Sequence, residues 1–383
     1  MKKRFSLLFA LIIVGCLFLT GCLPGAGGGF LCGGGSAPSG WSGPVLGNDT
    51  LYVGSMTGRV IALEDLSMAR ARIKWQYPPS DESALGYIYS TPCVADEVIY
   101  VAAYGSATRD PRVYAIDSEN GWRIWAYPEE GSIGPIIGGP VIANSTLYVG
   151  SSDGRLYAID IETGRDKWWF ETGDDIWASP AVHDGVVYIG SFDQKLYAVD
   201  VESGDEVWHF DTGAAIASTP LIYNDTIYVG SFDRKLYAIN LDGEEKWHFD
   251  EAENWFWAKA VAYGDFIIAG CLDGRVYALD AETGDRKWHY PPEDEERVGP
   301  VRGAPALVGD IVVFGSEDGK VYALDASTGQ ELWHYPPEED YLGPVRAPIC
   351  AGNGVVYIHA SNQKIYALEM EYGRINWSFS TVD

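Results

Sequence analysis

The sequence is poor in positive charge. Its 383 residues include 27 Lys and Arg but 54 Asp and Glu, which gives a formal net charge of −27. A protein that binds nucleic acid needs cationic side chains along the phosphates, so this negative net charge argues against nucleic-acid binding. It also argues against adhesion of the folded body to anionic lipid. We interpret the acidic residues, for example those at 293–296, as a charged surface that keeps the protein in solution and monomeric.

Cysteine is also scarce, and no two cysteines are adjacent. Two of the six, Cys16 and Cys22, belong to an N-terminal leader, and Cys32 follows it. This pattern does not predict a disulfide framework. The other three fall in different copies of a repeat, at what we interpret as non-equivalent strand positions, where we expect buried free thiols: Cys93, Cys271 and Cys350.

One long apolar run is present, at the N-terminus, and its length of about sixteen residues is short of a membrane span. With the preceding Lys2, Lys3 and Arg4, it predicts a secretory signal over residues 1–21. The segment Leu19-Thr20-Gly21-Cys22 resembles the bacterial lipobox, in which the cysteine is lipidated and anchors the exported protein to a membrane. Cys16 as the lipidated residue and an uncleaved signal anchor are the alternatives. Residues 22–40, rich in Gly, Ser and Pro, predict a flexible tether without strands.

The rest of the chain, residues 41–383, repeats one pattern eight times. The clearest copy, TLYVGSSDGRLYAIDIETGRDKWWF at 146–170, alternates apolar and polar residues with the period of two that is typical of strands. Its Ser-Ser-Asp-Gly and Glu-Thr-Gly sequences mark hairpin turns. With a further short strand before it, each copy predicts four antiparallel strands in about 40 residues.

The copies can be counted by an alanine in the third strand and a tryptophan that follows it, ten residues later in six copies. Eight four-stranded copies predict an all-β fold, an eight-bladed β-propeller in which ring closure shields the sheet edges. The tryptophans are Trp75, Trp125, Trp168, Trp208, Trp247, Trp288, Trp333 and Trp377.

The recurring motif Ala158-x-Asp160-x-x-Thr163-Gly164-x-x-x-Trp168 resembles the tryptophan-docking motif of quinoprotein (PQQ-type) propeller repeats. The resemblance covers essentially everything after residue 40 and implies that each tryptophan docks between two blades. A tryptophan buries a large ring and needs an acceptor for its N–H group. The motif therefore predicts architecture rather than activity.

Function is more readily sought where the copies differ. One such position of the repeat lies three residues before the proline, or its equivalent, in the first strand of each copy. Some copies have an aromatic residue or Arg at this position, and others have a small or aliphatic residue, such as Ile137 and Ala217. We expect these side chains to ring the channel mouth and bind a protein or peptide, because aromatic residues and arginine predominate at hot spots. Packing between loops is the alternative. The candidates are Trp41, Tyr89, Trp177, Trp257, Arg302 and, beside Val345 of the last copy, Arg346.

Little in the sequence indicates catalysis. Four histidines follow the repeated tryptophan and share one place on the outer strand, so they cannot converge on one metal: His209, His248, His289 and His334. The hairpin aspartates are expected to cap their own turns. The quinoprotein dehydrogenases use adjacent cysteines and a calcium site, and this chain has no adjacent pair. We therefore expect no catalytic residue, metal or cofactor.

With the lipobox, the repeats resemble the BamB family of outer-membrane assembly lipoproteins. The resemblance implies a non-catalytic, membrane-tethered extracytoplasmic propeller that acts as a protein-binding scaffold in envelope protein assembly. A PQQ-dependent or other quinone-type oxidoreductase and an extracytoplasmic ligand-sensing module are the alternatives, since a fold alone does not confer a function.

Overall fold

A computed structural model describes residues 22–24, 30–32, 42–47, 49–64, 66, 70–337 and 340–382. The chain divides into two compact units, Met1–Ser39 and Gly40–Asp383. The expected leader, residues 1–21, lies outside the described residues. In the first unit, β1 (Cys22–Pro24) pairs antiparallel with β2 (Phe30–Cys32). The sequence of the expected tether shows no strand pattern, but apolar residues on both sides of its glycine-rich stretch suit a short ladder.

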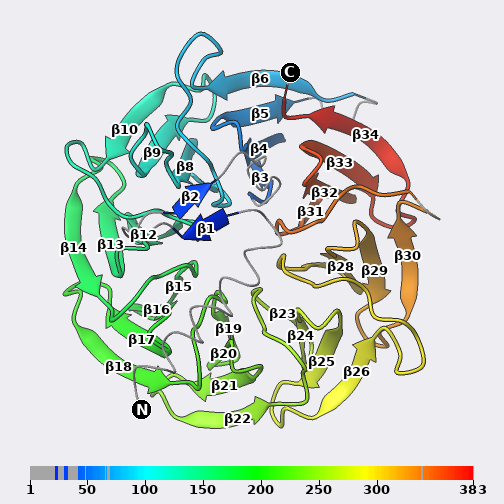
Figure 1. Cartoon of the computed structure of the whole chain (residues 1–383). Coiled ribbons are helices and arrows are strands. Elements are labelled where there is room, and N and C mark those ends of the chain that lie inside the picture. The colour runs from blue at the N-terminus through cyan, green and yellow to red at the C-terminus, as the bar shows by residue number, and fades with distance from the viewer. Residues whose placement is uncertain are drawn as a thin grey trace. The chain divides into compact units, whose positions relative to one another are not determined.

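The second unit is an eight-bladed β-propeller, as predicted (Figure 1). Each blade is one four-stranded antiparallel sheet whose strands follow chain order from the centre of the ring outward. Blades 1 to 4 comprise β3 (Val45–Gly47), β4 (Thr50–Gly54), β5 (Val60–Glu64), β6 (Arg72–Tyr77); β7 (Cys93–Ala95), β8 (Val98–Ala103), β9 (Arg112–Asp117), β10 (Arg123–Tyr127); β11 (Val141–Ala143), β12 (Thr146–Gly150), β13 (Arg155–Asp160), β14 (Asp166–Glu171); and β15 (Ala181–His183), β16 (Val186–Gly190), β17 (Lys195–Asp200), β18 (Glu206–Asp211).

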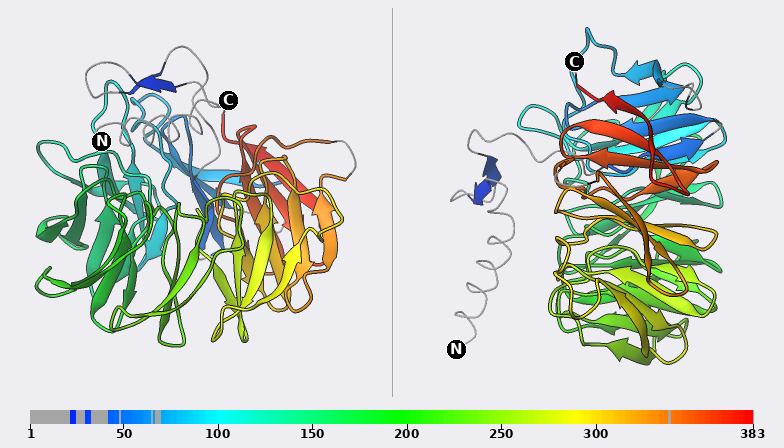
Figure 2. Two further views of the ribbon diagram at one scale, coloured as in Figure 1. Left: turned by 60° about the horizontal axis from the view of Figure 1, so that its bottom comes forward. Right: turned by 90° about the vertical axis from the view of Figure 1, so that its right-hand side faces the viewer.

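Blades 5 to 8 repeat this plan. They comprise β19 (Leu221–Tyr223), β20 (Thr226–Gly230), β21 (Leu236–Asn240), β22 (Glu245–Phe249); β23 (Val261–Tyr263), β24 (Phe266–Gly270), β25 (Val276–Asp280), β26 (Arg286–Tyr290); β27 (Ala306–Val308), β28 (Ile311–Gly315), β29 (Val321–Asp325), β30 (Glu331–Tyr335); and β31 (Cys350–Gly352), β32 (Val355–Ala360), β33 (Lys364–Glu369), β34 (Ile375–Ser380). The strands run across the thickness of the ring, so the loops gather on its two faces (Figure 2). In the part of the chain that the structure describes, no helix has the length and apolar character needed to cross a membrane.

The hydrophobic core lies between neighbouring blades. Tyr148, Ala158 and Trp168 are cross-strand partners in blade 3. With Leu156 they pack against apolar residues of blade 4 such as Ile189. The small alanine at the centre of each third strand is fully buried and leaves room for the larger rings beside it. Each blade thus buries its apolar face only against the next one, as the repeat pattern requires.

The repeated glycine at the end of the second strand is required by close packing. A Cβ atom added to Gly150 would lie 2.1 Å from Cγ2 of Ile176, which precedes the next blade. In two blades the same place in the ladder is taken by Ala102 and His359. His359 is fully buried, and its Nδ1 lies 3.0 Å from the carbonyl oxygen of Ser42.

The repeated tryptophans lie between blades. Trp168 donates its indole N–H to the carbonyl oxygen of Val201 in the next blade at 2.9 Å. Its ring covers Gly204, whose φ is +74° and whose absent Cβ would lie 2.7 Å from the ring. The other seven tryptophans donate to the following blade in the same way. Blades 1 and 8 share no strand. Across that junction Trp377 donates to the carbonyl oxygen of Leu66.

The register of blade 8 corrects two sequence-based assignments. Because β31 begins at Cys350, Ile349 takes the place of the opening proline, and Pro348 lies one residue earlier. The residue equivalent to Trp177 is therefore Arg346, whereas Val345 is fully buried. The same shift makes Cys350 equivalent to Cys93, so the view that the three cysteines occupy non-equivalent positions is wrong for this pair. All three thiols are free; Cys271 is buried and the other two are partly buried.

Candidate binding site at the channel mouth

One face of the ring carries both the hairpins between second and third strands and the segments that lead into each blade. We call it the mouth face. In successive blades the hairpin residue before the aspartate donates its backbone N–H to the leading segment, as Phe192 does to Asp175 and Phe232 does to Ala215, both at 2.9 Å. Each leading segment is thereby held against its own hairpin. The mouth face is a continuous rim of paired loops rather than a set of independent ones.

The hairpin aspartates hold these loops together. Oδ1 of Asp153 accepts the N–H of Arg155 at 3.1 Å, which caps the turn. Its Oδ2 accepts the hydroxyl of Tyr157 at 2.8 Å and the N–H of Gly134, in the leading segment, at 2.9 Å. Burial together with the bond to this carboxylate raises the pKa of Tyr157. Equivalent Asp–Tyr pairs occur in four more blades. These aspartates therefore have structural partners.

Blades 4 to 6 present a contiguous aromatic cluster at the mouth, formed by Trp177, Phe192, Phe232, Trp255 and Trp257. Phe232 stacks on Trp255 at 4.3 Å and on Trp257 at 5.2 Å between ring centroids. Phe192 contacts Phe232 at 5.6 Å and Trp177 at 4.5 Å. Trp177 and Trp257 lie 6.1 Å apart although they lead into blades 4 and 6. Blade 5 has the small, buried Ala217 at the same position, which leaves room for the two indoles to meet.

Next to the aromatic cluster lies an ion triad of Arg302, Arg346 and Glu317. The Nε atoms of the two arginines lie 2.9 and 3.0 Å from the same oxygen, Oε1 of Glu317. The guanidinium carbon of Arg302 also lies 4.7 Å from the centroid of Trp257. Burial alone would raise the pKa of Glu317, but the charges of both arginines and their hydrogen bonds outweigh it and lower that pKa. The carboxylate therefore stays ionised and fixes both guanidinium groups at the mouth.

The mouth of blades 1 and 2 has a different character. Tyr89 contacts Tyr104 edge to face at 4.9 Å and Tyr87 at 6.4 Å. Beside this tyrosine group lies a hollow of about 430 Å³ with Met56, Tyr87 and Arg109 among its lining residues. The hollow is built partly by the long hairpin of blade 2, residues 104–111, which is an insertion relative to the other copies.

The structure thus brings four of the six expected mouth residues together: Trp177, Trp257, Arg302 and Arg346. Tyr89 lies in the separate tyrosine group, and Trp41 lies outside the described residues. Four members of the site were not predicted from the sequence: Phe192, Phe232, Trp255 and Glu317. Three of these occupy the hairpin position before the aspartate, which varies from copy to copy as the first position does. A comparison of every variable position, rather than one, would have found them.

The four equivalent histidines have local partners on the outer strands. Nδ1 of His209, His248 and His334 lies 2.6, 2.7 and 2.6 Å, respectively, from the glutamate three residues earlier. His289 instead contacts the carbonyl oxygen of Pro291 and, at 3.3 Å, the carboxylate of Glu293. Throughout the described residues, no three His, Cys, Asp or Glu side chains are grouped as metal ligands would be.

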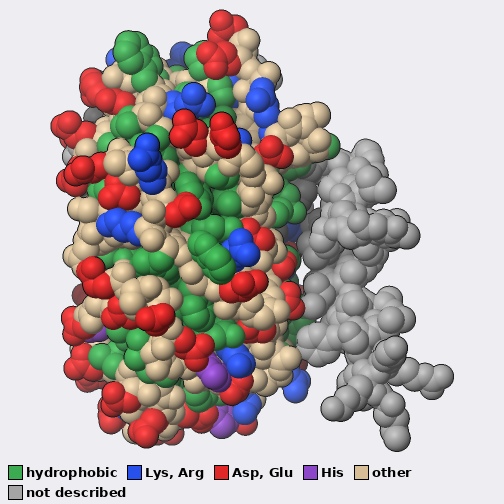
Figure 3. Space-filling model, turned by 90° about the vertical axis from the view of Figure 1, so that its left-hand side faces the viewer, with side chains coloured by type: hydrophobic (Ala, Val, Ile, Leu, Met, Phe, Trp, Pro, Cys, Tyr) green, Lys and Arg blue, Asp and Glu red, His purple; other side chains and the backbone are tan. Residues whose placement is uncertain are grey.

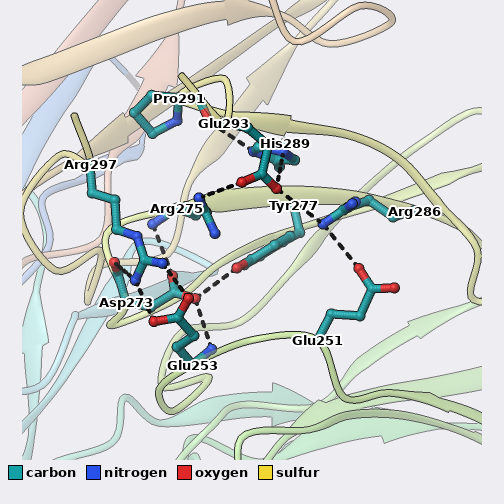
Figure 4. A network of polar contacts seen from close by, with 10 residues as sticks. All are labelled: Glu251, Glu253, Asp273, Arg275, Tyr277, Arg286, His289, Pro291, Glu293 and Arg297. Atoms are coloured by element: carbon teal, nitrogen blue, oxygen red, sulfur yellow. Dashed lines mark hydrogen bonds and ion pairs between the residues drawn. The ribbon is translucent and has the colours of Figure 1, made fainter. Parts of the chain in front are cut away.

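Figure 4 shows the network around His289, in which the acidic loop after β26 is held by cations. Arg275 contacts Glu293 at 3.3 Å, and Arg286 contacts Glu251 of the preceding loop at 2.9 Å. Arg297 pairs with Glu253. On the side of the ring that Figure 3 shows, acidic side chains are spread over the surface and outnumber the basic ones between them. The inner mouth of blades 6 to 8, with its arginines, therefore differs in charge from most of the molecule.

Eight four-stranded blades joined through the repeated tryptophans define a PQQ-like β-propeller. A profile of the family described as outer membrane protein assembly factor BamB matches residues 33–175 and 169–378. The chain belongs to this family.

Solved structures agree on the fold. The crystal structure of BamB from Moraxella catarrhalis superposes with a TM-score of 0.65 at 21% identity, over 86% of this chain and 92% of that one. The computationally designed Ika8 protein gives a TM-score of 0.66 at 15% identity, over 88% of this chain and 95% of that one. A quinohemoprotein alcohol dehydrogenase, ADHIIG of Pseudomonas putida, gives 0.62 at 17% identity, over 77% of this chain and 66% of that one. At these identities the likeness concerns the fold alone.

Curated relatives match over shorter segments. The quinohemoprotein alcohol dehydrogenase of Comamonas testosteroni is 31% identical over 133 residues, 33% of this chain and 17% of the relative. The serine/threonine-protein kinase AfsK of Streptomyces griseus is also 31% identical over 133 residues, 33% of this chain and 15% of the relative. The chain therefore spans only about a sixth of the length of these two relatives.

The names of the dehydrogenase relatives imply a quinone, and the described residues do not fit one. The indole of Trp257 already has Phe232 stacked on it and the Arg302 guanidinium over it. The three cysteines of the propeller lie in three different blades. A calcium ion needs several converging oxygens, and no such acidic group occurs among residues 42–382 as far as they are described.

Proposed function

We propose that this protein is a non-catalytic, membrane-tethered extracytoplasmic scaffold that binds a polypeptide partner at its mouth face, in envelope protein assembly. The membership of the BamB family supports the assembly role, and the lipobox-like segment ending in Cys22 supports the tether. Under this proposal residues 1–21 are the signal peptide, residues 22–40 connect the lipid anchor to the propeller, and the protein works as a monomer.

The observation that carries the proposal is the aromatic cluster with the ion triad beside it. A position that only holds a blade together has the same kind of residue in every copy, as the buried alanine does. The first of the positions that build the mouth instead varies in kind, from the aromatic Trp177 and Trp257 and the cationic Arg302 and Arg346 to the aliphatic Ile137 and the small Ala217. Partly exposed tryptophans and oriented arginines are the groups that contribute most to protein–protein affinity.

The oxidoreductase alternative has its own supporting observation, the dehydrogenase relatives at about 30% identity. These matches lie in repeat segments, and the repeat accounts for architecture in both groups of proteins. Because the residues at the mouth do not fit a quinone with calcium, we infer that the shared feature is the scaffold.

The test is a paired substitution of Trp177→Ala and Trp257→Ala in the full-length protein. Partners are captured by crosslinking and pull-down from the source envelope and identified by mass spectrometry. We expect partner affinity to fall by about 2–4 kcal/mol, because hot-spot truncations of this size do not add fully. Trp122→Ala is the matched control, since Trp122 is 75% exposed and lies just before β10, the outer strand of blade 2.

Both variants need a melting curve beside the capture assay. If the paired variant melts far below the parent and still captures the same partner with unchanged affinity, the rings belong to the core. The binding surface then lies elsewhere on the propeller.

A further inference from the structure

A lysine stands at the inner rim of the mouth, where the rest of the ring is uncharged. Lys259 lies two residues before β23, the innermost strand of blade 6. We call the residues at this position in the eight blades the inner hoop. Neighbouring members contact one another: the N–H of Gly139 donates to Oγ of Ser179 at 2.7 Å, and the N–H of Ser179 lies 3.3 Å from Oγ1 of Thr219. The hoop therefore encircles the channel opening.

Only the blade 6 member of the inner hoop carries a charge. The other seven are Gly43, Thr91, Gly139, Ser179, Thr219, Ala304 and Pro348. Small residues suit this place, since a Cβ on Gly43 would lie 2.9 Å from Oγ1 of Thr91 and 3.0 Å from the carbonyl oxygen of Pro348. A long cationic side chain in so narrow a ring is an exception that the architecture does not require.

Lys259 has no anionic partner within the described residues. Its side chain is exposed to solvent, and no hydrogen bond or ion pair holds its ammonium group. Burial is nevertheless the cause that lowers the pKa of Lys259. The ammonium group therefore reaches water, although protein atoms of the narrow inner hoop surround its position. In a chain with a net charge of −27, an unpaired and solvent-exposed ammonium at the inner hoop is available to an anion from outside.

The surroundings of Lys259 define what that anion is attached to. Trp257 of the aromatic cluster is two residues away in the same leading segment, and blades 7 and 8 contribute Arg302 and Arg346 along the rim. The two arginines share one carboxylate, that of Glu317, and no ion pair joins Lys259 to it. A ligand that is complementary to Lys259, Arg302 and Arg346 carries negative charge. A ligand that is complementary to the neighbouring aromatic cluster carries apolar side chains.

We propose that Lys259 receives a side-chain carboxylate of an extended peptide segment whose flanking apolar side chains lie on the aromatic cluster. This inference rests on the proposed function, in which the mouth face binds a polypeptide, and it adds the chemistry by which the partner is selected. The partner segment would carry Asp or Glu between aromatic or aliphatic residues.

The experiment measures binding of two capped peptides, acetyl-Gly-Phe-Glu-Phe-Gly-amide and its Gln counterpart, to the purified full-length protein by calorimetry. We expect the Glu peptide to bind about tenfold more tightly, because a bond between two ionised groups is stronger than one to a neutral amide. Lys259→Met should remove this preference by weakening the Glu peptide alone. Lys364→Met is the matched control, because Lys364 is also an exposed lysine but lies on the third strand of blade 8.

Amine acetylation followed by mass spectrometry gives a second readout. The Glu peptide should slow acetylation of Lys259 and leave that of Lys364 unchanged. The parent protein could bind both peptides equally, and the double variant Trp177→Ala, Trp257→Ala could weaken both to the same extent. This result would overturn the role of Lys259 and leave the mouth as the binding face. Binding of acetate as tightly as the Glu peptide would mean a small-anion site and would also overturn the proposal. Binding of neither peptide would count against the mouth face itself.

Discussion

Closure of the ring depends on one tryptophan contact that the chain connectivity does not enforce. Blades 4 and 5 are joined by a short segment, so they remain neighbours even if Trp208 is lost. No connecting segment joins blades 8 and 1; they are held by packing and by hydrogen bonds, one from Trp377 to Leu66, 311 residues apart in sequence, and one between His359 and Ser42. We therefore propose Trp377→Ala as the most informative perturbation, with Trp208→Ala as its internal comparison.

The expected cost can be worked from the contacts. The Trp377 side chain is 3% exposed, whereas that of Trp208 is partly exposed. Truncation of a buried tryptophan costs about 3–5 kcal/mol and leaves its carbonyl acceptor without a donor. We expect about 3 kcal/mol for Trp208→Ala and about 5 kcal/mol for Trp377→Ala. For a domain of about 340 residues this corresponds to a fall in Tm of about 4–7 °C.

The two substitutions should also differ in where the protein loosens. Native-state hydrogen exchange should show lost protection in β4, β5 and β33 for Trp377→Ala, because blades 1 and 8 separate locally. For Trp208→Ala the lost protection should stay within blades 4 and 5. A Tm unchanged within a degree for both variants would refute the reasoning that these rings hold neighbouring blades together. Trp122→Ala, at an exposed residue just before β10, controls for loss of an indole as such.

Three further outcomes are expected. Cys22→Ala should move the protein from the membrane to the soluble fraction, and a variant that stays fully membrane-bound would refute lipidation at this residue. Incubation with pyrroloquinoline quinone and calcium should give no bound chromophore and no dye reduction with alcohols or sugars; a stoichiometric chromophore would favour the oxidoreductase. Burial lowers the pKa of His359 from its usual value of 6.5, so the folded state takes up the proton less readily than the unfolded chain. The stability linked to His359 is therefore complete above about pH 6.5 and declines as the pH falls below it. His359→Gln should flatten the urea-measured stability difference between pH 7 and pH 5, and a variant with the parent's full difference would contradict this linkage.

The site was only partly predictable from the sequence, because an alignment of the repeats shows which positions vary but not which residues of different blades are in contact. Trp177 and Trp257 were found because they break the repeat at one position. Their contact with each other was not foreseeable, since it depends on the small Ala217 between them and on the curvature of the ring. Phe232, which stacks on Trp257 from a different loop, lies at a second variable position that was not compared.

The pairing of Glu317 with two arginines could not be inferred from sequence either. Arg302 and Arg346 belong to different blades, and Glu317 lies 15 residues after one and 29 before the other. A single extra residue before β31 also displaced the alignment of blade 8 on its proline. Because of that shift, the sequence alignment assigned Val345 to the mouth position and treated Cys350 and Cys93 as non-equivalent. The strand register corrects both assignments.

The sequence by itself determined the architecture, because period-two alternation, turn glycines and the alanine–tryptophan spacing are local properties that recur in every blade. It also determined that the mouth positions of blades 4, 6, 7 and 8 depart from the repeat. The tertiary structure decided which of those departures meet. Closing eight blades into a ring brings residues 80 positions apart, such as Trp177 and Trp257, within contact distance. It also sets Lys259 alone among uncharged neighbours at the channel opening, because neighbours on the inner hoop are distant in the chain and adjacent only in space.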